Sequence, residues 1–295
     1  MSVFLPALVP VVFIVLMGIV AQRFLKLDGT TLSQLSVYVL IPALIGDRIY
    51  RAELPATSAA GLVAGFVLTC VAMYGLALAI ARLRNMPPSK QASLSATTVF
   101  GNVGNMGLPI NAFAFGEAGL ERAAICLMAS AILFFTVGPA IYQGRGVGAG
   151  LRLILRLPLL YATLAGLSLR WMGVSMPWRL GEGIRSLGDA SIPIALLILG
   201  MQLAMTPFVL GRYEVSVSLL RLLVGPAIAF GIGRLLRLEG LDLQVLVLQC
   251  AMPSAVNTVV WAAEFGGDAG RVARTVVVST VLALVTLPLV LWLLT

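Results

Sequence analysis

The stretch FGNVGNMGLPI, residues 100–110, lies in the middle of an apolar run, residues 92–115, that is long enough to cross a lipid bilayer. It holds three glycines, two asparagines and a proline. Glycine and proline weaken a helix, and an asparagine amide in hydrocarbon costs free energy unless a partner satisfies it. The stretch therefore predicts a transmembrane helix that is broken at its midpoint.

The composition predicts an all-α integral membrane protein. Of the 295 residues, 60% are hydrophobic and only 11% are charged, far below the roughly 25% charge of soluble domains. The net charge of +8 is typical of basic loops beside anionic lipid and does not indicate nucleic acid. The sequence has no histidine, which excludes imidazole metal sites and histidine-based catalytic triads. We predict no enzyme activity, no metal and no cofactor.

Apolar runs between charge clusters predict ten transmembrane helices with short connections. They are expected near residues 3–21, 31–46, 57–81, 92–115, 120–142, 153–172, 186–205, 215–236, 243–263 and 275–294. The second and seventh are short, and we expect Pro42 and Pro193 to interrupt them. The glycine-rich segment QGRGVGAG after the fifth span divides the chain into a first half, residues 1–142, a cytoplasmic linker, residues 143–151, and a second half, residues 152–295.

Two short matches relate the halves to each other. An Ile-Pro pair at Pro42 has a counterpart at Pro193, 151 positions later, and GEAG at residues 116–119 has a counterpart, GDAG, at the same offset. With five spans in each half, the second copy must insert upside down, which is the inverted-repeat plan of many secondary transporters. The loops expected on the side of the central linker hold eleven Lys and Arg residues, and the opposite loops hold eight. This bias predicts that both termini lie outside the cell.

The same offset aligns Asn102 with Pro253, so we expect the ninth span to be broken at the level where the fourth is. Its sequence QCAMPSAVNTVVW, residues 249–261, supports this, because Pro253 lacks an amide hydrogen while Ser254 and Asn257 are polar. Opposed amino termini of half-helices would place partial positive charge at the centre of the protein and attract an anion without a buried Lys or Arg. The alternative is that the glycines only pack helices closely and the prolines only kink them.

The chain resembles the auxin efflux carrier family, through GNVGNMGLP in the fourth span, MPSAVNTVVWAAEFGGD in the ninth and LGDASIPIALLILGMQL in the seventh. The resemblance implies the fold of bile-acid symporters and sodium/proton antiporters, in which the fourth and ninth spans of a core domain cross beside a scaffold domain. It also implies transport of small organic anions such as carboxylates or auxin-like weak acids by an elevator-type movement, in a bacterial inner membrane and as a homodimer. The long cytoplasmic loop of many plant members is absent here.

The candidate site follows from the two broken spans and from the resemblance. The candidate substrate-binding residues are Asn102, Asn105, Asn257, Ser254 and Thr258. The candidate crossover and hinge residues are Gly101, Gly104, Gly107, Pro109, Pro253, Pro42 and Pro193.

Two carboxylates are candidates for coupling transport to sodium or protons. Asp189 lies one helical turn before Pro193, and Glu264 lies two turns after Asn257 on the same face. Alternatively, Asp189 is a first-turn residue favoured by the helix dipole and Glu264 is a loop residue at the water interface. Arg221 stands about six residues into the eighth span, and we expect it to extend towards the cytoplasmic surface.

The leading hypothesis is therefore a secondary transporter of small organic anions in the lipid bilayer. The alternative is a cation exchanger in which the same broken helices coordinate sodium or protons. Such exchangers usually place a carboxylate beside the crossing, whereas the polar residues here are Asn, Ser and Thr. The sequence leaves the identity of the anion, the direction of transport and its coupling open.

Overall fold

The computed structural model describes residues 4–25, 27–143 and 155–294, and these residues form helices joined by short connections. Seven helical stretches within them have the length and apolar composition needed to cross a membrane: Leu8–Leu25, Gly29–Arg51, Ala56–Leu83, Val103–Gly138, Pro177–Met205, Arg212–Leu235 and Ala269–Leu294. The expected all-α integral membrane protein is confirmed. The ten crossings and the inverted relation of the halves stay predictions.

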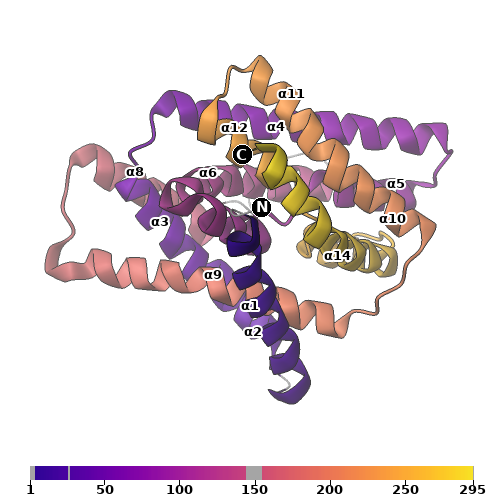
Figure 1. Cartoon of the computed structure of the whole chain (residues 1–295), viewed down its shortest axis with the longest axis horizontal. Helices are drawn as coiled ribbons and strands as arrows, with labels where there is room; N and C mark the ends of the chain where they lie inside the picture. The colour runs from indigo at the N-terminus through magenta and orange to yellow at the C-terminus, as the bar shows by residue number, and fades with distance from the viewer. Residues whose placement is uncertain (1–3, 26, 144–154, 295) are drawn as a thin grey trace.

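One group of helices packs around α9, and we call it the first group (Figure 1). Its close packing comes from small residues: a side chain at Gly18 would meet the backbone of Leu197, and one at Gly200 would meet the backbone of Val15. The group consists of α1 (Phe4–Leu25), α2 (Gly29–Leu35), the π-helical turn Ser36–Leu40, α3 (Ile41–Arg51), α8 (Pro158–Met172), the 3-10 turn Pro177–Arg179 and α9 (Leu180–Met205).

The remaining helices form the second group, which carries both broken segments (Figure 1). Its interior is apolar, with Phe66, Met106 and Leu246 almost fully buried. The group consists of α4 (Ala56–Leu83), α5 (Pro88–Val99), the π-helical turn Val103–Gly107, α6 (Leu108–Gln143), α10 (Arg212–Leu219), the π-helical turn Leu220–Val224, α11 (Gly225–Leu235), α12 (Gly240–Cys250), α13 (Asn257–Glu264) and α14 (Ala269–Leu294).

Four predicted features either differ in the structure or lie outside the described residues. The prediction that Pro193 interrupts a short seventh span is wrong, because α9 is one helix of 26 residues with Pro193 in its interior. Pro42 stands in the first turn of α3, directly after a π-helical turn that provides the local irregularity. The predicted loop at GEAG is a break within α6, where Gly116 has a φ of 65° and a ψ of −155°. Of the predicted linker, only Gln143, the last residue of α6, is within the described residues.

Candidate functional site

The two predicted breaks are present, and the broken segments meet each other. α5 ends at Val99 and α12 at Cys250, and beyond these ends Gly101 and Ser254 form an isolated antiparallel bridge. The backbone N–H of Asn102 donates to the Pro253 carbonyl at 2.7 Å, and the backbone N–H of Ala255 donates to the Phe100 carbonyl at 2.9 Å. This short antiparallel pairing satisfies backbone groups that the interrupted helices release, which is necessary inside a bilayer.

Two predicted binding residues bond to the backbone instead of facing a ligand, and one of them, Ser254, links the two broken segments. The buried Ser254 hydroxyl donates to the Thr97 carbonyl at 2.8 Å, and the Ser254 amide donates to the Ser279 hydroxyl oxygen at 3.2 Å. The Thr258 hydroxyl, also buried, donates to the Ala255 carbonyl at 2.6 Å. Both hydroxyls are therefore committed to backbone, and neither residue lines the cavity described next.

Helices restart on either side of the crossing. The backbone carbonyl of Asn102 accepts a hydrogen bond from the backbone N–H of Gly107 at 3.0 Å, and this bond begins the π-helical turn Val103–Gly107. That turn leads into α6, with Pro109 in the first turn of the helix. Proline suits this position because a first-turn amide has no helical acceptor. α13 restarts at Asn257. The amino-terminal ends of two helices, with their free amides and partial positive charge, thus lie at one place.

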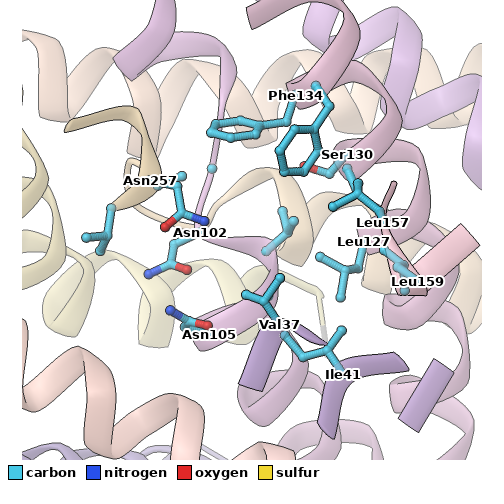
Figure 2. A pocket seen from close by; sticks show the side chains of 17 residues that line it. Val37, Ile41, Asn102, Asn105, Leu127, Ser130, Phe134, Leu157, Leu159 and Asn257 are labelled. Atoms are coloured by element: carbon cyan, nitrogen blue, oxygen red, sulfur yellow. The ribbon is translucent and has the colours of Figure 1, made fainter. Parts of the chain in front are cut away.

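A cavity of about 130 Å³ adjoins these amino termini and lies between the two helix groups. In Figure 2 the side chains of Asn102, Asn105 and Asn257 lie on one side of it, and apolar side chains that include Leu127 and Leu159 lie across from them. The first group contributes Val37, Ile41, Leu157 and Leu159, and the other lining residues come from the broken segments and from α6. The cavity is therefore apolar with one amide-lined wall, a common design of small-molecule sites.

The three asparagines differ in burial and in hydrogen bonding. Asn102 is only 5% exposed, and its Nδ2 is buried without a hydrogen-bond partner among the described residues. Asn105 is half-buried and Asn257 is exposed. A buried amide hydrogen without an acceptor costs free energy, so a ligand that accepts a hydrogen bond would relieve that cost.

The three predicted hinge glycines serve two purposes. Gly101 and Gly104 line the cavity, whereas Gly107 does not. A side chain at Gly101 would meet the guanidinium of Arg221, and one at Gly107 would meet the amide of Gln249. The alternative that glycines permit close packing thus applies to Gly101 and Gly107.

Arg221 lies at the crossing, and the prediction that it extends to the cytoplasmic surface is wrong. Its side chain is buried, and its Nε donates to the Met252 carbonyl at 3.0 Å. Its Nη1 donates to the carbonyls of Thr98 at 3.0 Å and Val99 at 3.2 Å. The broken helices end in carbonyls without helical partners, and these attract the guanidinium more strongly than a distant surface. The expected absence of a buried cation at the crossing is likewise wrong.

The two coupling candidates lie away from the cavity. Asp189 is half-exposed and pairs with the Arg48 guanidinium, with Oδ1 and Nη2 3.1 Å apart, while Arg48 also pairs with Glu117 of α6. Glu264 is exposed at the end of α13. Pro42 and Pro193 also lie outside the cavity lining, although Ile41, next to Pro42, belongs to it.

Sequence reasoning missed Ser130 and the apolar wall. Ser130 of α6 is 7% exposed and lines the cavity together with Phe134. A lone serine in the apolar run ICLMASAILFF is the signal that points to it. Among the described residues, no group of three carboxylate or cysteine side chains could hold a metal ion.

Comparisons with known proteins find transporters. A protein family described as "Membrane transport protein" matches residues 3–152 and 147–291. An "Uncharacterized transporter" of Methanothermobacter thermautotrophicus is 33% identical over 89% of this chain and 88% of that protein. A protein of Rhizobium meliloti named "Putative malonate transporter" is 24% identical over 92% of this chain and 90% of its own length. Auxin efflux carrier component 3a of Oryza sativa is 30% identical over 45% of this chain and 23% of its own.

Proposed function

Because the chain belongs to the auxin efflux carrier family of membrane transport proteins and is no enzyme, we propose that it is a secondary transporter of small organic anions, bound at the crossing of the broken helices. The observation that carries this proposal is the buried Nδ2 of Asn102, a donor without a partner in a cavity wall. An anion there accepts from Asn102 and gains from the two helix amino termini. Asn105 and Asn257 complete the amide wall.

The size of the cavity favours small carboxylates. At about 130 Å³ it is comparable to an engineered cavity of about 150 Å³ that accommodates benzene. Malonate is of that size class, and one relative carries malonate in its name. Indole acids such as auxin are larger and would require the cavity to widen.

The position of the cavity supports alternating access by an elevator-type movement. The amide wall belongs to the second group and part of the apolar wall to the first, so sliding one group against the other would carry the bound anion. The ten spans in two inverted repeats, both termini outside, a bacterial inner membrane and a homodimer belong to this proposal. Their support is the sequence repeat, the distribution of Lys and Arg, and the family resemblance.

The test is the thermal stability of the purified full-length protein against malonate, other mono- and dicarboxylates, indole acids and amino acids, each with and without sodium. A ligand present at 100 times its dissociation constant should add about 2.7 kcal/mol of stability. We expect malonate or a similar small carboxylate to raise the melting temperature, and Asn105→Ala and Asn257→Ala to lose most of that shift. Ser216→Ala, on the exposed face of α10, is the control and should keep it.

Two results would contradict the proposal. If no anion raises the melting temperature while sodium or pH alone does, the cation exchanger becomes the better description. If both asparagine variants keep the full shift, the anion binds elsewhere.

A further inference from the structure

We propose that Arg221 is a resident cation at the crossing, which occupies the carbonyl cluster of the two half-helices and makes anion binding independent of sodium. Its effect on the anion rests on the transport function proposed above. The binding of Arg221 to the carbonyl cluster does not rest on that function, and the experiment below tests the two statements separately.

The contacts of Arg221 are those of a cation bound between two helix ends. Three backbone carbonyls surround its guanidinium, those of Thr98 and Val99 at the end of α5 and that of Met252 just after α12, at 3.0–3.2 Å. Each carbonyl lies at the carboxyl-terminal end of a half-helix, where the helix dipole is negative. In broken-helix transporters, such carbonyls coordinate sodium. Here a side chain of the protein takes that place.

Among the described residues, no carboxylate pairs with Arg221 to balance its charge. The side chain is 2% exposed, and within the described part of the chain its guanidinium forms no ion pair. A buried charge is tolerated only when it is well hydrogen-bonded, which the three carbonyls achieve. Partial charges from dipoles do not cancel a full positive charge at a distance, so part of its field extends into the surroundings.

The cavity is the part of these surroundings where an anion would gain from that field. Gly101 lines the cavity, and the guanidinium packs against it so closely that a side chain on Gly101 would clash with Nη2. The guanidinium thus stands behind the cavity wall. It would attract an anion without contacting it, so Arg221 is a positioning residue and not a ligand.

Arginine suits this role better than lysine or a free ion. Its planar guanidinium presents five donors in fixed directions, so one side chain reaches carbonyls from two separate helices. Its charge persists at any physiological pH, and it cannot dissociate as sodium does. We therefore expect the crossing to be complete without an added cation.

The experiment compares sodium chloride with choline chloride at equal ionic strength, using the melting temperature of the full-length protein. We expect the wild type to melt at the same temperature in both salts. Arg221→Ser, which frees the three carbonyls, should melt lower in choline and recover partly in sodium or in dilute guanidinium. Arg234→Ser removes the same charge from an exposed position on α11, and it should show no cation-specific recovery.

A second arm uses malonate as the probe. The shift that malonate causes should be equal in sodium and choline for the wild type and for Arg221→Lys, which keeps the charge. Arg221→Ser should bind malonate about tenfold more weakly in choline, as expected for the loss of a nearby unit charge, and should regain affinity in sodium. If malonate shifts not even the wild type, the proposed substrate is wrong, while the first arm still tests Arg221.

Either of two results would overturn the proposal. One is a melting temperature of the wild type that is higher in sodium than in choline, since that requires a cation site still open to sodium. The other is an Arg221→Ser protein that recovers with neither sodium nor guanidinium. If Arg221→Ser does not fold, the comparison of the wild type in sodium and in choline decides, because a sodium-specific gain in its melting temperature would contradict the proposal and equal melting temperatures would support it.

Discussion

Asn102 and Asn111 are two buried asparagines of one broken segment, and their amides have different surroundings. The Asn111 Nδ2 donates to the Gly107 carbonyl at 2.8 Å, whereas the Asn102 Nδ2 has no partner in the described residues. We expect Asn102→Ala to weaken malonate binding 10- to 100-fold, because a hydrogen bond to a charged group contributes about 1.5–3 kcal/mol. The same change should leave the melting temperature without ligand nearly unchanged, since the lost donor was unsatisfied. Calorimetric titration and thermal unfolding measure the two effects.

Asn111→Ala is the matched control with the opposite outcome. It removes a satisfied hydrogen bond at a position that does not line the cavity. It should therefore destabilise the protein by about 1 kcal/mol and leave the affinity for malonate unchanged. Equal affinities in wild type and Asn102→Ala would remove the main support for the proposed site.

Single residues also show where sequence reasoning succeeded and where it failed. Asn102, Asn105 and Asn257 were predicted to gather, and all three line one cavity, because amides in an apolar span are conspicuous and the repeat aligns the two breaks. Arg221 was misplaced because an arginine near a span end usually reaches the interface. Its partners, the carbonyls of two other helices, become visible only once the chain is folded.

At the scale of elements, the crossing of the fourth-span segment and α12 depends on Gly107. The Gln249 amide, which is fully buried and donates to the Ala123 carbonyl at 3.2 Å, packs against the Cα of Gly107. A methyl group there would clash with the end of the Gln249 side chain. Because this side chain is enclosed and hydrogen-bonded, we expect its displacement in Gly107→Ala to destabilise the protein by about 1–3 kcal/mol, the usual cost of overpacking. Thermal unfolding without ligand measures this cost.

Gly231→Ala is the control for that change. Gly231 also lies in a helix, but a side chain there would meet no atom within 4 Å. Because alanine favours a helix over glycine by up to about 1 kcal/mol, Gly231→Ala should leave stability unchanged or raise it slightly. Equal melting temperatures for Gly107→Ala and the wild type would show that the crossing adapts, against the packing role assigned to Gly107.

Secondary-structure elements were predictable where the local residues alone determine the backbone conformation. The breaks near Asn102 and Pro253 were foreseen, because clustered Gly, Asn and Pro oppose a continuous helix whatever surrounds them. Pro193 led to a wrong prediction, because a helix can continue across a single proline when neighbouring helices pack against it on both sides of the proline. α9 packs in this way against α1 and α3. The π-helical turns have no comparable sequence signal. They arise where packing adds a residue to a turn.

At the scale of the whole molecule, the sequence could predict the membrane class but not the contact between helix groups. Hydropathy depends on each segment alone, so apolar runs show which helices suit a bilayer. The apolar wall of the cavity joins Ile41 of α3, Leu159 of α8 and Leu127 of α6. No local pattern indicates that these three segments face one another, because many leucines of the described residues are instead exposed on the surface of the molecule.

The native cysteines offer a direct test of movement between the groups. Cys70, Cys126 and Cys250 are all buried, so a thiol introduced into the cavity would be the accessible one. Ala131 lines the cavity from α6 and has no assigned role in binding. We expect Ala131→Cys to react with a membrane-impermeant maleimide from either face of the membrane, in right-side-out and in inside-out vesicles, because an elevator exposes its site to each side in turn. The wild type should stay unlabelled, which controls for the native thiols.

Added malonate should slow this labelling from both faces, because the bound anion covers position 131 in each state, whereas sodium chloride alone should not slow it. A static cavity would give a different pattern. It would admit the reagent from one face only, and malonate would slow the reaction on that face alone. Labelling restricted to one face, in vesicles that transport malonate, would contradict the elevator-type movement while leaving the anion site itself in place.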